Sequence, residues 1–95
     1  MRGETKMMDD DILIKGSYVK ISNYRVKVMN TLEPGEVKIP KEIAKDTDII
    51  PNHISKTLRE LKDNNLIECI NEEARKGRLY RLTPLGIEVK QYLEG

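Results

Sequence analysis

Apolar residues recur at helical spacing in three stretches of the chain. In residues 17–32 they lie three or four positions apart, at Tyr18, Ile21, Tyr24, Val28 and Leu32. Residues 51–64 show the i, i+4, i+7 spacing, and residues 84–93 repeat an apolar residue every four positions. Such periodicity gives a helix one apolar face. It predicts helices over residues 17–32 and 51–64, and a last helix that starts at Pro84 with Thr83 as its N-cap.

A short helix is expected just before residue 51. Pro40 suits the first position of a helix, where its missing N–H is not needed, and Ile43 and Ala44 give residues 40–45 an apolar side. The turn that follows is Asp-Thr-Asp, and its last residue, Asp48, tolerates a left-handed backbone better than most residues. This segment and the next therefore predict a helix, a turn and a second helix.

Alternating apolar and polar residues follow this pair of helices. Residues 66–71 and 78–83 each alternate, which predicts two antiparallel strands with one buried face. The residues expected on the core face are Ile67, Cys69, Tyr80 and Leu82. Ile70 and Leu79 fall on the other face, where we expect something to cover them. Residues 36–39 also alternate and could pair with this hairpin.

The beginning of the chain lacks a comparable pattern. Residues 1–10 are polar apart from a pair of methionines, and we interpret them as a mobile tail. Residues 11–16 contain Ile-Leu-Ile, which is too apolar to stay in water without a partner. We therefore expect an N-terminal extension over residues 1–16. Since 95 residues suffice for one small domain, residues 17–95 are expected to form it.

Composition narrows the possible functions. The chain has one cysteine and one histidine, so an internal disulfide is excluded and no Cys/His metal site is expected. Neither a phosphate-binding glycine motif nor a nucleophile with a nearby base is evident, which argues against an enzyme and against a bound cofactor. No apolar run approaches the roughly 20 residues that span a bilayer, and residues 1–11 lack the apolar stretch of a secretory signal. A cytoplasmic location is expected.

The charges are unevenly distributed. Lys and Arg number 17 and Asp and Glu 16, so the net charge of +1 does not point to a nucleic-acid partner. Basic residues nevertheless outnumber acidic ones in residues 12–83, while both ends of the chain carry an excess of acidic residues. Local clusters therefore matter more than the total charge.

The first turns of the helix over residues 51–64 hold side chains that suit DNA. If this helix enters a major groove, the residues nearest the base edges are Pro51, Asn52, His53 and Lys56. Asparagine suits adenine and lysine suits guanine. Ser55 and Arg59 are then expected on the phosphate side. The alternative is that Lys56 and Glu60 form an ordinary surface ion pair one turn apart and that Asn52 is merely solvated.

The loop between the two strands, residues 72–78, is a second candidate. Arg75, Lys76 and Arg78 surround Gly77, and cations on a flexible turn can reach a minor groove or the flanking phosphates. Glu72 and Glu73 would weaken attraction to DNA unless they point away. The alternative interpretation is a solvated hairpin without a ligand.

Several of these segments together resemble a known family. They are Ile43-Ala44-Lys45, the helix from Ile54 to Leu61, Asn65-Leu66-Ile67-Glu68, residues 77–86 and the Tyr24 to Met29 segment. The sequence over residues 17–93 resembles the winged helix-turn-helix regulators of the MarR and ArsR type, particularly small archaeal members. The resemblance implies an α+β, mainly α fold, in which a three-helix core carries a β-hairpin wing and a C-terminal helix. It makes residues 51–64 the recognition helix and residues 72–78 the wing.

The chain also departs from this family. Ile39 and Ile50 stand where the two helices usually have Ser or Thr caps, and Asp48 replaces the usual glycine of the turn. The uncapped start of the helix at Pro51 should leave N–H groups free at Asn52 and His53 to meet a phosphate. Metal-sensing cysteine clusters and long dimerisation helices are missing.

The function implied by this resemblance is sequence-specific binding of double-stranded DNA by a transcriptional regulator. We expect a homodimeric repressor, joined through its first and last helices, with recognition helices about 34 Å apart. Nothing identifies a small-molecule effector. The alternative is a winged-helix protein-interaction module within a transcription or processing assembly, which would use the hairpin face with Ile70 and Leu79.

Overall fold

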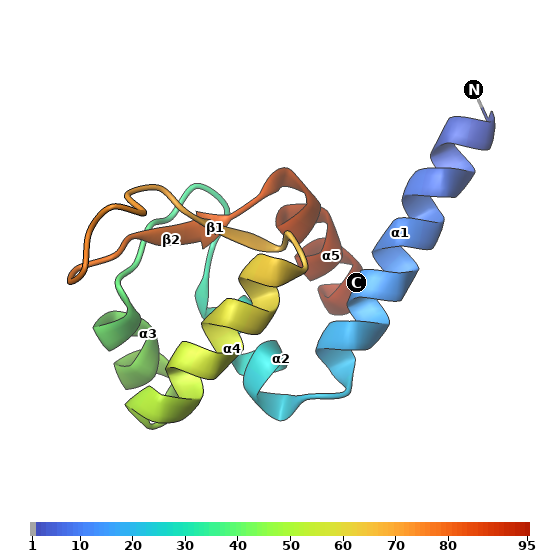
Figure 1. The fold of residues 1–95 in the computed structure, drawn as a ribbon. Helices are drawn as coiled ribbons and strands as arrows, with labels where there is room; N and C mark the ends of the chain where they lie inside the picture. The colour runs from blue at the N-terminus through green and yellow to red at the C-terminus, as the bar shows by residue number, and fades with distance from the viewer. Residues whose placement is uncertain (1) are drawn as a thin grey trace.

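Helices dominate the fold, as the computed structural model of residues 2–95 shows, with side chains described from residue 10 onward (Figure 1). The elements in order are α1 (Arg2–Lys20), α2 (Asn23–Thr31), α3 (Pro40–Thr47), α4 (Pro51–Asp63), β1 (Ile67–Cys69), β2 (Tyr80–Leu82) and α5 (Pro84–Glu94). The two strands form one antiparallel sheet. The protein is thus α+β and mainly α, as the sequence predicted.

The sequence predicted a single helix over residues 17–32, and this prediction is wrong. The chain forms α1 up to Lys20, breaks at Ile21 and Ser22, and starts α2 at Asn23. Ser22 is the N-cap of α2, because its hydroxyl accepts a hydrogen bond of 3.3 Å from the backbone N–H of Arg25.

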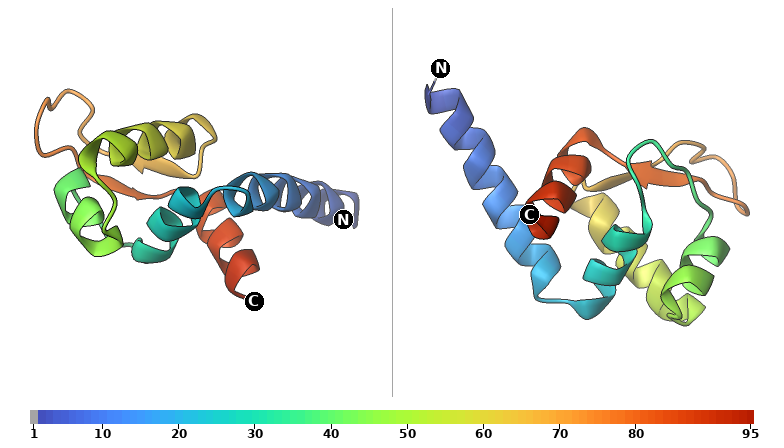
Figure 2. Two further views of the ribbon diagram at one scale, coloured as in Figure 1. Left: turned by 90° about the horizontal axis from the view of Figure 1, so that it is seen from below. Right: turned by 180° about the vertical axis from the view of Figure 1, so that it is seen from behind.

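The expected N-terminal extension is helical in the structure. Residues 2–10, which were interpreted from the sequence as a mobile tail, form the first part of α1, and Met1 lies outside the described residues. The boundary proposed between residues 16 and 17 falls inside α1. Two views in Figure 2 show that the N-terminal half of α1 projects beyond the rest of the molecule, while its C-terminal half packs against α5.

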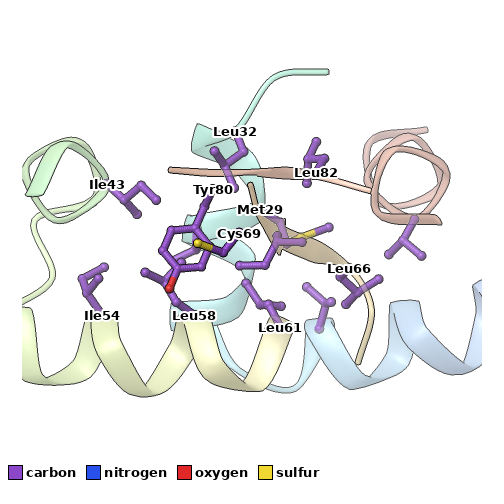
Figure 3. Packing of buried hydrophobic residues seen from close by; sticks show 14 of the residues in the cluster. Met29, Leu32, Ile43, Ile54, Leu58, Leu61, Leu66, Cys69, Tyr80 and Leu82 are labelled. Carbon is purple, nitrogen blue, oxygen red and sulfur yellow. The ribbon is translucent and has the colours of Figure 1, made fainter. Parts of the chain in front are cut away.

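The core lies where α2, α3 and α4 meet the sheet and α5. Ile43 of α3 and Ile54, Leu58 and Leu61 of α4 point toward Met29 and Tyr80 (Figure 3). Apart from Tyr80, the buried core cluster is aliphatic or sulfur-containing among the described residues. The apolar stripe predicted for α4 therefore faces inward, and the opposite side of α4 is left to solvent.

The structure confirms the hairpin and its buried face. Ile67 pairs with Leu82 and Cys69 with Tyr80, and all four side chains are buried. Each strand has three residues, fewer than the six predicted. Lys38 forms an isolated bridge to Tyr80, so the short run over residues 36–39 meets the hairpin at one residue.

Lys38 also ties α2 to α3 through its side chain. Its ammonium donates to the Asp46 carboxylate at 2.6 Å and to the Thr31 hydroxyl at 3.2 Å. The hydrogen bond to Asp46 raises the pKa of Lys38, and the same bond lowers the pKa of Asp46. The pair therefore stays charged at neutral pH. Its contribution to stability is lost when the pH falls through the lowered pKa of Asp46 or rises through the raised pKa of Lys38.

The turns that leave α4 and enter α5 are joined by hydrogen bonds. The hydroxyl of Thr83 donates to the carbonyl of Asn65 at 2.7 Å and accepts from the N–H of Gly86 at 2.9 Å, and so caps α5 as predicted. The N–H of Thr83 donates to the carbonyl of Leu66 at 3.1 Å. We call Asn65, Leu66, Thr83 and Gly86 the turn junction. It fixes both ends of the hairpin relative to α4.

A buried lysine joins α5 to α2. The Lys90 side chain is 4% exposed, and its ammonium donates to the carbonyls of Met29 and Asn30 at 3.0 Å each. The carboxylates of Glu33 and Glu94 lie 3.8 Å and 3.5 Å away. A cation near the last carbonyls of α2 is favourable, and the two carboxylates balance its charge.

None of the helices among residues 2–95 combines the length and apolar content needed to cross a bilayer.

The turn junction predicts that Gly86→Ala destabilises the fold. A Cβ added at Gly86 would overlap the carbonyl oxygen of Leu66, which is backbone and cannot rotate away. In an open helix, Gly→Ala stabilises by up to about 1 kcal/mol. Here we expect the free energy of unfolding to fall by about 1–3 kcal/mol, measured by urea denaturation.

Lys45→Ala, at an exposed position of α3, is the control and should change stability by no more than about 0.5 kcal/mol. A Gly86→Ala protein as stable as the wild type would contradict the close approach of α5 to the turn after α4.

Candidate nucleic-acid interface

A groove runs between α4 and the loop of the hairpin. Its volume is about 500 Å³. The residues that line it are Pro40, Ser55, Leu58, Arg59, Lys62, Asp63, Arg75, Gly77, Arg78 and Tyr80. We call it the α4–loop groove. It forms because the turn junction holds the hairpin beside the solvent-facing side of α4.

The α4–loop groove is strongly basic. Four cations line it, Arg59 and Lys62 from α4 and Arg75 and Arg78 from the loop, against the single carboxylate of Asp63. The sum of these charges is far more positive than the net charge of the whole chain suggests. Such a concentration of one sign attracts a polyanion and can hold its phosphate groups.

Four of the residues predicted to contact DNA meet in this groove: Ser55, Arg59, Arg75 and Arg78. Five others do not line it. Pro51, Asn52, His53 and Lys56 are exposed on the first turns of α4, and Lys76 is exposed at the tip of the loop. The structure therefore separates the predicted residues into a groove set and an outward-facing set.

The outward-facing set includes a histidine with a ring neighbour. The centroids of the His53 imidazole and the Tyr24 ring lie 5.1 Å apart, with the planes tilted by 44°. Tyr24, on α2, remains 40% exposed. From the sequence, this tyrosine was assigned to the apolar face of a helix over residues 17–32. The structure instead places it beside the first turn of α4.

Lys56 does not form the ion pair that the alternative interpretation required. Glu60 accepts instead from Arg25 of α2, whose Nε lies 3.1 Å from the Glu60 Oε1. The Arg25 guanidinium also donates to the carbonyl of Tyr18 at 2.8 Å and stacks 3.8 Å from the centre of its ring. Within the described part of the chain, Lys56 has no carboxylate within 4.0 Å.

The start of α4 differs from expectation in one detail. Ile39 and Ile50 indeed provide no side-chain cap. However, the N–H of His53 donates to the carbonyl of Ile50 at 3.0 Å and is not free. Of the N–H groups predicted to be available, only that of Asn52 lacks a partner among the described residues. Asp48, before this turn, adopts the left-handed conformation expected of it, with φ of 61°.

Two side chains hold the loop in shape. The Asn71 carboxamide accepts from the N–H of Leu79 at 2.7 Å and donates to the carbonyl of Gly77 at 3.2 Å. The Arg78 guanidinium donates to the carbonyls of Ala74 and Glu72 at 2.8 Å each. Arg78 was predicted as a DNA contact. The structure shows that two of its donors are already used within the loop, which makes it an internal brace.

Sequence reasoning missed Lys62. It lines the α4–loop groove, and its ammonium lies 3.3 Å from the Glu72 carboxylate of the loop. The signal was present, because Lys62 follows Ser55 by seven positions and Arg59 by three, which places all three on one side of a helix.

A second groove lies between α1 and α5. Its volume is about 580 Å³, and it is lined by Ile12, Leu13, Glu88, Gln91 and Tyr92. Leu13 and Tyr92 are 46% and 43% exposed. We call it the α1–α5 groove. Its apolar side chains and its place at the base of the projecting helix distinguish it from the basic groove.

The hairpin's outer face is only partly covered. Ile70 is 44% exposed and Leu79 is half-buried, while Glu68 and Arg81 pair across the strands at 2.7 Å.

No group of three His, Cys, Asp or Glu side chains in the described region is placed to hold a metal ion.

Comparisons of the sequence with protein-family models and with curated proteins, and of the structure with solved structures, gave no match.

The loop contacts predict that Arg78→Lys loosens the loop although it keeps the charge. Lysine cannot donate from two fixed positions to the carbonyls of Ala74 and Glu72. We expect a loss of about 1 kcal/mol of local stability, which corresponds to roughly fivefold faster hydrogen exchange at the N–H groups of Ala74 and Leu79.

Arg75→Lys is the matched control, since within the described chain the Arg75 guanidinium makes no hydrogen bond. Equal exchange rates in the two variants would show that Arg78 does not brace the loop.

Proposed function

We propose that this protein is a winged helix-turn-helix regulator that binds specific double-stranded DNA sequences and acts as a homodimeric repressor. The observation that carries the proposal is the α4–loop groove, where four cations from two separate elements line one depression. No single stretch of sequence supplies this charge, so it arises from the fold.

The order of the elements supports the winged-helix assignment. A short helix, a tight turn at Asp48 and a longer helix precede a two-stranded hairpin, and α3 packs on α4. In DNA-binding proteins of this kind, the second helix of such a pair occupies the major groove. In this chain that helix is α4, and the loop of residues 72–78 is the wing.

The two sets of residues suit different parts of a duplex. Asn52, His53 and Lys56 are exposed on the first turns of α4 and have side chains that can bond to base edges. The cations of the α4–loop groove suit a phosphate strand lying between α4 and the loop. Lys76, exposed at the loop tip, suits flanking phosphates.

A dimer would explain the projecting helix. Helices shorter than about 12–15 residues are only marginally stable in water by themselves, and the N-terminal half of the 19-residue α1 extends past α5 (Figure 2). The α1–α5 groove beside it exposes Leu13 and Tyr92. A second copy seated on α1 and α5 would cover these side chains and place two copies of α4 in successive major grooves. Repression by blocking access to DNA requires no further domain.

The proposal predicts salt-dependent duplex binding that relies on the groove cations. The protein is first used to select duplexes from a random pool, and affinity for the selected duplex is then measured over a range of salt. Replacing Arg59 and Arg75 together by alanine should remove about two phosphate contacts. The slope of log affinity against log salt should shrink by about two, and affinity should drop at least tenfold at low salt.

Lys27→Ala is the control, because Lys27 is an exposed cation of α2 that does not line the α4–loop groove. It should change the slope little. The proposed function would be contradicted if the selected duplexes shared no sequence. It would also be contradicted if the double variant had the same slope of log affinity against log salt as the wild type.

The dimer predicts that Leu13→Asp produces a monomer, as judged by sedimentation velocity at several concentrations. A charge placed in the α1–α5 groove would have to be buried against the second copy. Ile21→Asp is the matched control, since Ile21 is 80% exposed and lies outside the groove. A wild-type monomer at all concentrations, or equal effects of the two substitutions, would argue against this interface.

A further inference from the structure

One ion pair joins α4 to the loop and involves a lysine that lines the α4–loop groove. The carboxylate of Glu72 lies 3.3 Å from the ammonium of Lys62. Lys62 belongs to α4 and lines the groove, whereas Glu72 belongs to the loop and is not one of the lining residues, so the ion pair links α4 to the loop beside the groove. It uses one of the four groove cations in an internal contact.

The position of Glu72 is set by the fold. Its carbonyl accepts a hydrogen bond of 2.8 Å from Arg78, the residue that braces the loop. The Asn71 carboxamide fixes the preceding position through its bonds to Leu79 and Gly77. The backbone at Glu72 is therefore held where its carboxylate can reach Lys62.

The pair is weak enough to be exchanged. The Lys62 side chain is 35% exposed and that of Glu72 is 62% exposed, and ion pairs with such access to water contribute little to stability. A phosphate group in the groove offers Lys62 an anion of the same charge. The Lys62 ammonium can therefore exchange the Glu72 carboxylate for a phosphate at little cost.

The neighbouring acids do not share this arrangement. Within the described structure, Glu73 is exposed and has no cation within 4.0 Å, and Asp63 lines the groove but is not paired. Among the acidic side chains from residue 10 onward, only that of Glu72 is paired with a groove cation. From the sequence, both Glu72 and Glu73 were expected to weaken attraction to DNA unless they point away. In the structure the two differ, because Glu72 is paired with Lys62 and Glu73 is not paired with a described cation.

We propose that Glu72 is a built-in competitor of the DNA phosphates, which occupies Lys62 in the free protein and is displaced when a phosphate enters the α4–loop groove. This inference rests on the proposed function. It adds Lys62 to the contact residues and makes Glu72 a residue that lowers affinity. Binding of any polyanion then has to replace an existing ion pair, which weakens attachment to arbitrary DNA.

The test compares four proteins in binding to one mixed-sequence DNA duplex at low salt: wild type, Glu72→Gln, Glu73→Gln and Lys62→Ala. Glu73→Gln is the matched control, because it removes the same charge from the next position. We expect Glu72→Gln to tighten binding about two- to fivefold and Glu73→Gln to tighten it clearly less. Lys62→Ala should weaken binding.

A double variant isolates the pair. In a Lys62→Ala background, Glu72→Gln should tighten binding no more than Glu73→Gln does, because the cation for which Glu72 competes is gone. Equal gains from the two glutamine substitutions would reduce the effect to net charge and overturn the inference. So would a Glu72→Gln gain that persists without Lys62, or weaker binding by Glu72→Gln, which would mean that the ion pair helps by ordering the loop.

These results separate the inference from the function on which it rests. If the wild type binds duplex DNA but the two glutamine variants behave alike, only the competitor role fails. If the wild type binds no duplex, the proposed function fails and the competitor role fails with it.

Discussion

The hydrogen bonds that join the turn after α4 to the start of α5 determine where the hairpin lies. Thr83 contributes both its backbone and its hydroxyl to this junction, and Gly86 allows α5 to approach the Leu66 carbonyl. Because both ends of the hairpin are anchored there, its loop comes to rest beside the outer side of α4.

Local patterns in the sequence predicted most of the elements correctly. The α4 stripe, the Thr83 cap, the buried hairpin face and the left-handed Asp48 each depend on neighbouring residues, and the structure confirms them. The break between α1 and α2 was missed because the apolar spacing continues across it. Ser22 was the available signal. Serine is a preferred N-cap residue, and its hydroxyl can accept a hydrogen bond from the N–H three positions later, here that of Arg25.

The roles of individual charged residues could not be predicted in the same way. Arg25 pairs with Glu60, thirty-five residues away, and Arg78 donates to carbonyls whose direction depends on the loop backbone. Lys62 and Glu72 meet only after the hairpin has folded back onto α4. Such partners are chosen by tertiary structure, so the sequence identified Arg59, Arg75 and Arg78 of the groove without Lys62, and without showing which of these cations are already bonded.

The buried Lys90 has a mechanical consequence for any dimer built on α1 and α5. Its bonds to the last carbonyls of α2 fasten α5 to the helical core and so oppose independent rotation of the two helices. The angle between two copies of α4 would then be a fixed property of the assembly. A dimer of this kind would bind two DNA half-sites, one for each copy of α4. Each base pair added between the half-sites rotates the second half-site by about 35° around the duplex axis. If the proposed DNA binding by a dimer holds, a rigid dimer would select DNA by helical phase as well as by base sequence.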